Sequence, residues 1–234
     1  FDYFATGHYS IIEYNEKTGR YLLKKGIHEG KDQAYFLSML SQKQFGRILF
    51  PLGGKIKSEV RKIAEEAGLF TTDKRESQDL CSGDYRDFID DSKGPGNFID
   101  GSGLILGRHK GIENYTIGQR RGLGISSSSD PWYVIGIKPD NNVVVLGINS
   151  DLLNKGMMVS KCNWIAAARP DFPVKVDAKI RYRDNGAPAI LTEIGEDLIE
   201  VLFSEERRAV TPGQVAVFYD GDTVIGAGII QKGF

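Results

Sequence analysis

The sequence has little of what cross-links small proteins or binds metals. Only 2 cysteines and 3 histidines occur among its 234 residues. Two cysteines are too few for a disulfide scaffold, and neither they nor the histidines show the spacing of metal ligands. We therefore expect no metal site built from these side chains, and a reducing, cytoplasmic setting.

Long apolar runs and a dominant charge are missing as well. No stretch approaches the ~20 apolar residues that cross a bilayer. The chain opens at Phe1 in mixed polar sequence, without the basic start and long apolar stretch of a signal peptide. We therefore expect no membrane partner. The net charge of −1 argues against a protein that coats nucleic acid through bulk charge, although it leaves room for local basic patches.

Basic side chains gather in four short groups. They are Arg108-His109-Lys110, Arg120-Arg121, Arg181 with Arg183, and Arg207-Arg208. Groups of this kind are most often solvated surface, and the alternative is a contact with nucleic acid. Composition does not decide between the two, because 41% hydrophobic and 26% charged residues are typical of any globular protein.

The N-terminal residues predict strands and helices in the order of an α/β domain. Residues 1–6 read as a buried strand, and residues 21–24 as a second, short strand. Apolar residues near helical spacing predict a helix over residues 32–49. Ser58 is placed to cap a second helix, and Gly68 to end it. A domain rarely begins with a core strand, so we expect that further sequence precedes Phe1.

The rest of the chain is dominated by turns and short strands. Residues 73–103 are polar and rich in Gly, Asp and Ser, with one short helical stretch near residues 85–90. From about residue 158 onward, alternating apolar and polar residues predict successive strands and a small β-barrel, with Asp220-Gly221 as a hairpin turn. The predicted fold is α/β plus β, with an α/β part over residues 1–72, a central domain over 73–150 and a C-terminal β-barrel over 151–234.

Cys81 differs from Cys162 in its surroundings. Cys81 lies in a polar, glycine-containing segment, whereas free cysteine is usually buried. It is either a nucleophile or sulfur carrier, or an incidental surface thiol. A carrier role needs a nearby cation to lower the pKa of the thiol, and Lys74, Arg75 and Arg86 are candidates. Cys162 lies in a predicted strand, where a structural role is favoured.

Two glycine-containing segments could contact a phosphate-bearing partner. Gly7 and His8 follow the first predicted strand, and α/β folds place their ligands at the carboxyl ends of strands. In residues 115–125, three glycines alternate with two arginines and a glutamine, which suits a loop lying close to a phosphate. A tight turn with solvated arginines is the alternative for that loop.

Together these segments resemble successive motifs of the tRNA-specific 2-thiouridylase family, in the family's order and over nearly the whole chain. The motifs that carry the resemblance are Ala5-Thr6-Gly7-His8-Tyr9, Lys31-Asp32-Gln33-Ala34-Tyr35-Phe36-Leu37, Phe50-Pro51-Leu52-Gly53, Lys57-Ser58-Glu59-Val60-Arg61, Tyr115–Ile125, Pro131-Trp132-Tyr133-Val134, Arg181-Tyr182-Arg183 and Thr211-Pro212-Gly213-Gln214.

The resemblance implies a fold and a reaction. The fold is the C-terminal end of a Rossmann-like ATP-pyrophosphatase domain, a small central domain and a C-terminal β-barrel that binds tRNA. The reaction is the ATP-dependent transfer of sulfur from a cysteine persulfide to the 2-position of the wobble uridine of tRNA. ATP, with Mg²⁺, activates the uridine, and a sulfur-relay donor protein loads the persulfide.

The resemblance also implies roles for individual residues. Cys81 matches the persulfide cysteine, and Gly7 matches a nucleotide contact. Seven residues match tRNA contacts: His8, Lys31, Asp32, Gln33, Arg181, Tyr182 and Gln214. The family's glycine-rich pyrophosphate loop (Ser-Gly-Gly-x-Asp-Ser) and a second cysteine would precede Phe1, so we expect this chain alone to be inactive.

Two other functional classes stay open from the sequence. One is a non-catalytic RNA-binding module, in which the β-barrel binds tRNA and Cys81 is incidental. The other is a relative that modifies a different base or uses another sulfur donor.

Overall fold

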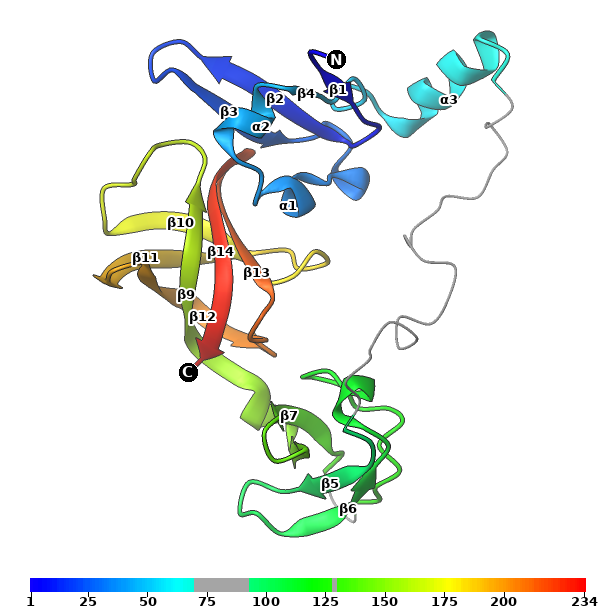
Figure 1. Ribbon diagram of the computed structural model, residues 1–234, viewed down its shortest axis with the longest axis vertical. Helices are drawn as coiled ribbons and strands as arrows, with labels where there is room; N and C mark the ends of the chain where they lie inside the picture. The colour runs from blue at the N-terminus through cyan, green and yellow to red at the C-terminus, as the bar shows by residue number, and fades with distance from the viewer. Residues whose placement is uncertain (70–92, 128–129) are drawn as a thin grey trace. The chain divides into compact units, whose positions relative to one another are not determined.

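The computed structural model describes residues 1–69, 93–127 and 130–234, which form two compact units (Figure 1). The first unit holds described residues 1–69, 156–205 and 212–234. The second holds described residues 93–127, 130–155 and 206–211. Cys81 and the helical stretch predicted near residues 85–90 lie outside the described residues. Within the described parts, no helix is long and apolar enough to cross a membrane.

A six-stranded barrel forms the larger part of the first unit. Its strands follow one another around the barrel in the order β13-β10-β11-β12-β9-β14, and β14 pairs with β13 to close it. Closure leaves no unpaired strand edge within the ring. The barrel predicted from alternating sequence is therefore confirmed. The strands are β9 (Leu153–Trp164), β10 (Val174–Lys179), β11 (Ala187–Gly195), β12 (Leu198–Arg208), β13 (Val215–Asp220) and β14 (Thr223–Gly233).

The last hairpin differs from its prediction by one residue. Asp220 pairs with Thr223, so the two turn residues are Gly221 and Asp222. Gly221 has a φ of 57°, in the left-handed region that such a turn requires and that glycine adopts at little cost.

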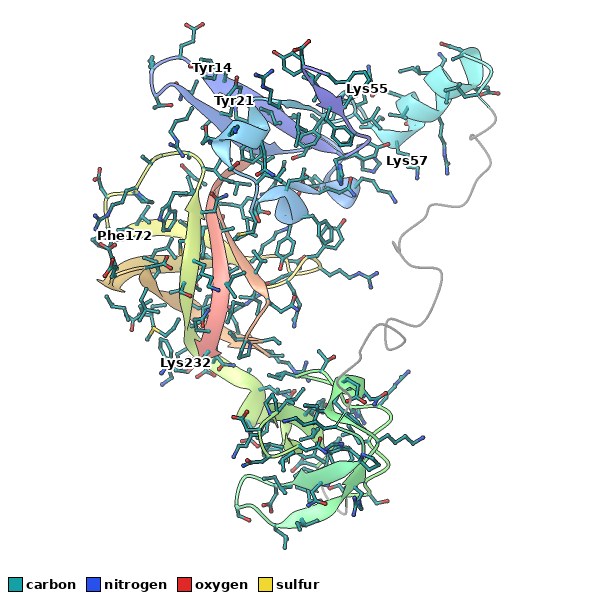
Figure 2. The ribbon with its side chains drawn as sticks, in the orientation of Figure 1. Tyr14, Tyr21, Lys55, Lys57, Phe172 and Lys232 are labelled. Carbon is teal, nitrogen blue, oxygen red and sulfur yellow. The ribbon has the colours of Figure 1, made fainter. Side chains whose placement is uncertain are left out.

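A second hairpin joins the N-terminal residues to the barrel. It consists of β2 (Ser10–Asn15) and β3 (Arg20–Lys25), and the pairing of Lys24 with Thr223 attaches it to β14. Tyr14 and Tyr21 lie opposite each other across the hairpin, with ring centroids 4.9 Å apart (Figure 2).

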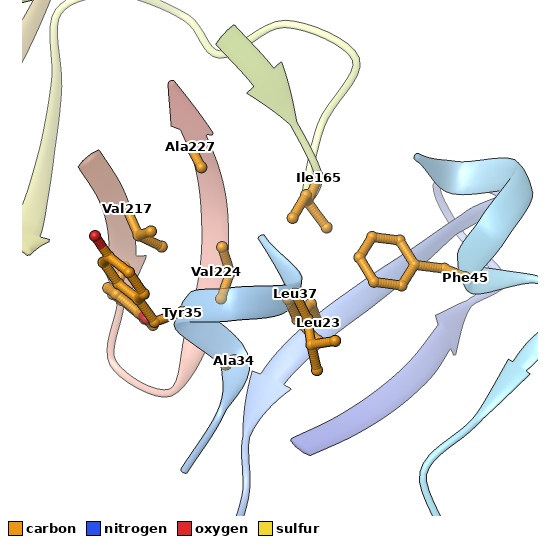
Figure 3. Close-up of a cluster of buried hydrophobic side chains, with 10 residues drawn as sticks. Leu23, Ala34, Tyr35, Leu37, Phe45, Ile165, Val217, Val224 and Ala227 are labelled. Atoms are coloured by element: carbon orange, nitrogen blue, oxygen red, sulfur yellow. The ribbon is translucent and has the colours of Figure 1, made fainter. Parts of the chain in front are cut away.

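The helix predicted over residues 32–49 is two short helices. They are α1 (Ala34–Leu37) and α2 (Gln42–Phe45), followed by β4 (Ile48–Leu49); a 3₁₀ turn, η1 (Glu29–Lys31), precedes them. The chain breaks because Ser41 caps α2 in a capping box with Gln44, which fixes a new helix start. The two helices pack on β3 and on the β13–β14 hairpin of the barrel (Figure 3). This shared core is made of Leu23, Ala34, Tyr35, Leu37, Phe45, Ile165, Val217, Tyr219, Val224 and Ala227.

The remaining N-terminal elements contain no buried residues. β1 (Phe4–Ala5) pairs in parallel with β4, as an α/β domain requires. The prediction that this first strand is buried was wrong, because Phe4 is 66% exposed and no described residue forms a layer over it. α3 (Lys57–Glu66) begins after Ile56 and not after Ser58, because Glu59 accepts the Ile56 N–H and starts the helix earlier. Gly68 ends it with a φ of 67°, as predicted.

The second unit is a four-stranded sheet with its own core. Its strands are β5 (Gly96–Ile99), β6 (Ile105–His109), β7 (Tyr133–Lys138) and β8 (Val143–Gly147), in the order β6-β5-β8-β7. Two 3₁₀ turns, η3 (Ile112–Asn114) and η4 (Asn149–Leu152), complete it. The β7–β8 hairpin predicted from the turn residues 139–142 is confirmed. Phe98, Leu123, Val134, Val144 and Leu146 form the core.

Candidate functional site

In the first unit, α1 brings together segments that are far apart in the sequence. The Tyr35 hydroxyl donates a hydrogen bond to the carbonyl of Val215 at 2.7 Å. The Phe36 ring lies on the Tyr182 ring, with centroids 4.4 Å apart. Val215 follows Gln214, and Tyr182 follows Arg181. Through these contacts α1 connects two segments of the barrel to the residues that precede α1 in the sequence. Those segments contain six residues predicted to contact tRNA: Lys31, Asp32, Gln33, Arg181, Tyr182 and Gln214.

The loop between β10 and β11 holds its basic side chains outward. The buried carboxylate of Asp184 accepts the backbone N–H of Ile180 at 3.0 Å and so closes the loop. Arg181, Tyr182 and Arg183 are then left exposed. Neither guanidinium forms an ion pair with any carboxylate in the described parts of the chain. Both charges are therefore available to an anionic partner.

Asp32 and Gln33 hold the backbone ahead of α1. The buried Asp32 carboxylate accepts the N–H groups of Gly26 and Ala34, each at 3.1 Å. Burial raises the pKa of Asp32, and the backbone N–H groups and the charges of Lys179 and Lys25 oppose that rise. Gln33 accepts the N–H of Tyr9 at 3.0 Å. The geometry gives both side chains an anchoring role; their predicted contacts with tRNA stay predictions.

Lys31, one of the predicted tRNA contacts, lies near a second group of positive charges. Partial burial, together with the charges of Lys31 and Arg61, lowers the pKa of Lys57. The ring Nδ1 of His28 accepts the Lys57 N–H at 3.0 Å and fixes the start of α3 there; Figure 2 shows Lys57 at this end of the helix. The sequence motif contained Lys57 and Arg61, but only the fold shows that their charges are close to that of Lys31.

Gly7 and His8 follow β1, at the strand end where ligands of α/β folds bind. A Cβ on Gly7 would meet only Leu52, at an ordinary 3.7 Å, so packing does not explain the glycine. His8 is held by a 2.7 Å hydrogen bond between its Nδ1 and the Thr6 hydroxyl, and by an edge contact with Phe50. No described residue hydrogen-bonds its Nε2. Both residues are thus placed so that they can meet a ligand.

A nucleotide with Mg²⁺ would need more than this strand end. The described residues contain no group of three or more His, Cys, Asp or Glu side chains that could hold a metal ion. They fit one edge of a nucleotide site, at Gly7, and do not form a phosphate-cradling loop.

Two predictions about single residues are settled by burial. Cys162 lies half-buried in β9, as predicted, and burial together with the Asp197 charge raises the pKa of its thiol to about 12. Such a thiol stays protonated and unreactive at neutral pH. His109, counted in a basic surface group, is in fact buried. Its Nδ1 accepts the Gly111 N–H, its Nε2 donates to Asn142, and burial lowers its pKa.

The glycine-containing loop of residues 115–125 is ordered in the second unit. The Gly118 N–H bonds to the Val134 carbonyl at 2.8 Å, and Gln119 ties the loop to itself through the Thr116 N–H and the Arg121 carbonyl. A cavity of about 270 Å³ opens beside it. The cavity is lined by Arg120, Leu123, Ile125, Ser127, Pro131 and Trp132.

The other basic pair of this unit is less free. Arg208 lies 5.0 Å from the centre of the Tyr133 ring and donates to the Asn149 side chain at 2.9 Å. Its guanidinium supports the fold of the second unit, whereas Arg121 remains exposed.

Three domain families match the chain in succession. Residues 1–83 match the tRNA methyl transferase HUP domain, residues 86–148 the tRNA methyl transferase PRC-barrel domain, and residues 154–230 the aminomethyltransferase beta-barrel domain. These matches, with the barrel and the parallel β1–β4 pair, confirm the predicted fold class of an α/β part, a central domain and a C-terminal β-barrel.

Similar proteins cover almost all of the chain. The tRNA-specific 2-thiouridylase MnmA 1 of Caldanaerobacter subterraneus is 50% identical over 98% of this chain and 65% of its own length. The MnmA proteins of Clostridioides difficile and Nostoc punctiforme are 46% and 44% identical, each over 99% of this chain and over 66% and 67% of their lengths. The chain thus spans about two-thirds of the length of the curated relatives it matches. Because this identity runs through all three of its domains, the chain belongs to the tRNA-specific 2-thiouridylase family.

Proposed function

We propose that the protein containing this chain transfers sulfur to the 2-position of the wobble uridine of tRNA. The observation that carries the proposal is the 44% to 50% identity to tRNA-specific 2-thiouridylases along nearly the whole chain. The domain family that matches residues 1–83 is named after tRNA methyl transfer, whereas these relatives are named after 2-thiouridine formation. The relatives support thiolation more strongly, because each covers the three domains together while each domain description covers only one.

The residues gathered by α1 would bind the RNA. Arg181 and Arg183 would neutralise phosphates, with Lys31 serving the same strand from the N-terminal side and Gln214 supplying a polar contact. His8 would meet the RNA near the nucleotide contact of Gly7. An enzyme that changes a base carbon must take the base out of its stack, and an anticodon loop offers bases that can be extracted.

Sulfur delivery would fall to Cys81. ATP supplies the activation that turns the 2-oxygen of the uridine into a leaving group, and a sulfur-relay donor supplies the persulfide sulfur that replaces it. Cys81 would carry that sulfur as a persulfide whose outer sulfur attacks carbon 2 as AMP leaves, and a second cysteine of the full-length protein would break the S–S bond by forming a disulfide with Cys81. With only 2 cysteines the chain has no disulfide framework, so the cytoplasm is the proposed location. The 234-residue chain alone would not thiolate tRNA, because its sequence contains no Ser-Gly-Gly-x-Asp-Ser loop.

Nucleoside analysis of a deletion strain tests the proposal. Total tRNA from a strain without this gene should lack 2-thiouridine at the wobble position, and the full-length gene should restore it. A Cys81→Ser gene should fail to restore it although the protein still binds tRNA. Cys162→Ser is the matched control and should restore it, because that thiol is half-buried and protonated.

Three results would contradict parts of the proposal. Normal wobble 2-thiouridine in the deletion strain, with another base unmodified, would assign a different substrate. Restoration by Cys81→Ser would remove the carrier role. An unchanged nucleoside profile in the deletion strain would favour a non-catalytic RNA-binding protein.

A further inference from the structure

Three aromatic rings meet where α1 touches the barrel. Tyr35 is buried and fixed by its hydrogen bond to Val215. Phe36 stands edge-on to it, with ring centroids 5.7 Å apart and planes at 90°. Tyr182, from the β10–β11 loop, lies 6.2 Å from Tyr35 and 4.4 Å from Phe36, with its plane tilted by 37° to that of Phe36. The buried ring thus supports two outer rings that rest on each other.

The two outer rings remain open to solvent. Phe36 is 58% exposed and Tyr182 is 37% exposed, so the contact between them covers only part of each ring. A single exposed phenylalanine needs no explanation. Here, however, the phenylalanine contacts a tyrosine that lies between two exposed arginines, Arg181 and Arg183, neither of which pairs with a described carboxylate. Aromatic faces next to free guanidinium groups suit a ligand that has both a flat ring and an anionic backbone.

The Tyr14–Tyr21 pair shows that two solvent-accessible rings in contact are not always flanked by free guanidinium groups. Its centroids are 4.9 Å apart, and Tyr14 is 52% exposed. Arg20, beside it, donates to the carbonyls of Trp164 and Ile165 and supports the fold. Glu13 and Glu16 lie close to Tyr14 in the sequence. Lys17 in the hairpin turn is exposed, but the pair has no arginine beside it with a guanidinium left for a phosphate, so it serves as an internal control.

We propose that Phe36 and Tyr182 form a stacking platform for one unpaired nucleobase of the RNA substrate, with Phe36 as a positioning residue. The proposal rests on the proposed function in one respect, because it takes tRNA as the partner. Bases in single-stranded RNA stack on aromatic side chains, and this contact tolerates any base because every base has a flat face. Arg181 and Arg183 would hold the phosphates on either side of the stacked nucleotide.

The platform has a signature that phosphate contacts lack. Stacking releases no counterions, so removal of a ring should weaken binding equally at low and high salt. Removing one base–aromatic stack should weaken RNA binding by about 5- to 150-fold. Because each ring supports the other, the double variant Phe36→Ala/Tyr182→Ala should bind little more weakly than the worse of the two single variants.

The test measures binding of an unmodified tRNA transcript with a wobble uridine to the full-length protein at several salt concentrations. Phe36→Ala should weaken binding about 5- to 150-fold with an unchanged salt slope. Phe36→Leu keeps apolar bulk against Tyr35 but has no ring, so it should also weaken binding, whereas Phe36→Trp should bind as the wild type does. Tyr14→Ala, the matched control, should leave binding unchanged.

Several outcomes would overturn the platform. Binding by Phe36→Leu within about twofold of wild type would show that only apolar bulk matters. Equally weakened binding by Phe36→Ala and Tyr14→Ala would show a nonspecific effect, and a flattened salt slope in Phe36→Ala would assign its effect to a displaced arginine. Failure of the proposed function is separable: a wild type that binds tRNA but forms no 2-thiouridine contradicts the chemistry and leaves the platform standing.

Discussion

Two portions of the first unit are built from residues 1–69, and they differ in what they bury. The β2–β3 hairpin, α1 and α2 share a core with β13 and β14, where Leu23 is fully buried. β1, β4 and α3 bury almost nothing among the described residues, and Leu49 is 49% exposed. The same stretch of chain therefore holds one portion packed on the barrel and one portion without a packed layer.

The difference teaches where the N-terminal residues get their stability. Helices of four residues, such as α1 and α2, are too short to be stable alone in water. Their order comes from packing against the barrel. That packing also brings the Lys31–Gln33 segment to Tyr182 and Val215, so the core contact and the candidate RNA surface depend on each other.

Two leucine substitutions should separate the portions most strongly. Leu23→Ala removes a fully buried side chain from the shared core and should lower the free energy of unfolding by about 2–5 kcal/mol. Leu49→Ala, the matched change in β4, should lower it by less than about 0.5 kcal/mol. Urea denaturation of the two variants checks the difference. Equal destabilisation by the two substitutions would mean that β4 is as well packed as the portion that packs on the barrel.

Alternation and turn residues were enough to predict the barrel strands, because strands such as β10 and β11 have one buried and one solvated face, although β13 is buried on both faces. They were not enough for residues 32–49, where apolar residues continue at helical spacing but Ser41 starts a new helix through Gln44. Spacing reports which side chains are apolar, whereas the break depends on a side-chain hydrogen bond to the backbone. His109 was misassigned for a similar reason, because its polar atoms find backbone partners inside the fold.

The candidate site was predictable as separate motifs but not as a surface. The motifs around Lys31 and Arg181 are visible in the sequence, and their proximity through α1 is not. The sequence pattern groups Phe36 with the apolar positions of a helix. Its exposure and its contact with Tyr182, 146 positions away (182 − 36), depend on the tertiary fold. Cys81 lies outside the described residues, so its role remains a prediction.

The pH dependence of stability is a second test of the portion packed on the barrel. Burial raises the pKa of Asp32 above 3.8, so the folded state binds its proton more tightly than the unfolded state does. The contribution of Asp32 to the free energy of unfolding should therefore fall as pH rises from 3.8 to the pKa of Asp32 in the folded state. Above that pKa it should stay constant. Asp32→Asn keeps an oxygen for the N–H groups of Gly26 and Ala34 but does not titrate there.

Unfolding measured from about pH 3 to about pH 8 checks this expectation. The stability of wild type relative to Asp32→Asn should fall as pH rises through the window just above 3.8. A difference that rises with pH would mean that the carboxylate is stabilised by its positive neighbours, Lys25 and Lys179, more than it is destabilised by burial.

The most direct test of the candidate RNA surface is the salt dependence of tRNA binding by Arg181→Ala in the full-length protein. Removing one side chain that neutralises a phosphate should lower the slope of log affinity against log salt by about one. Arg181→Ala should therefore bind more weakly, with a slope about one unit flatter and unchanged ATP affinity. Arg169→Ala, which removes a guanidinium paired with Glu193, should leave the slope unchanged. An unchanged slope together with a lowered melting temperature in Arg181→Ala would assign that arginine to the barrel and contradict the account.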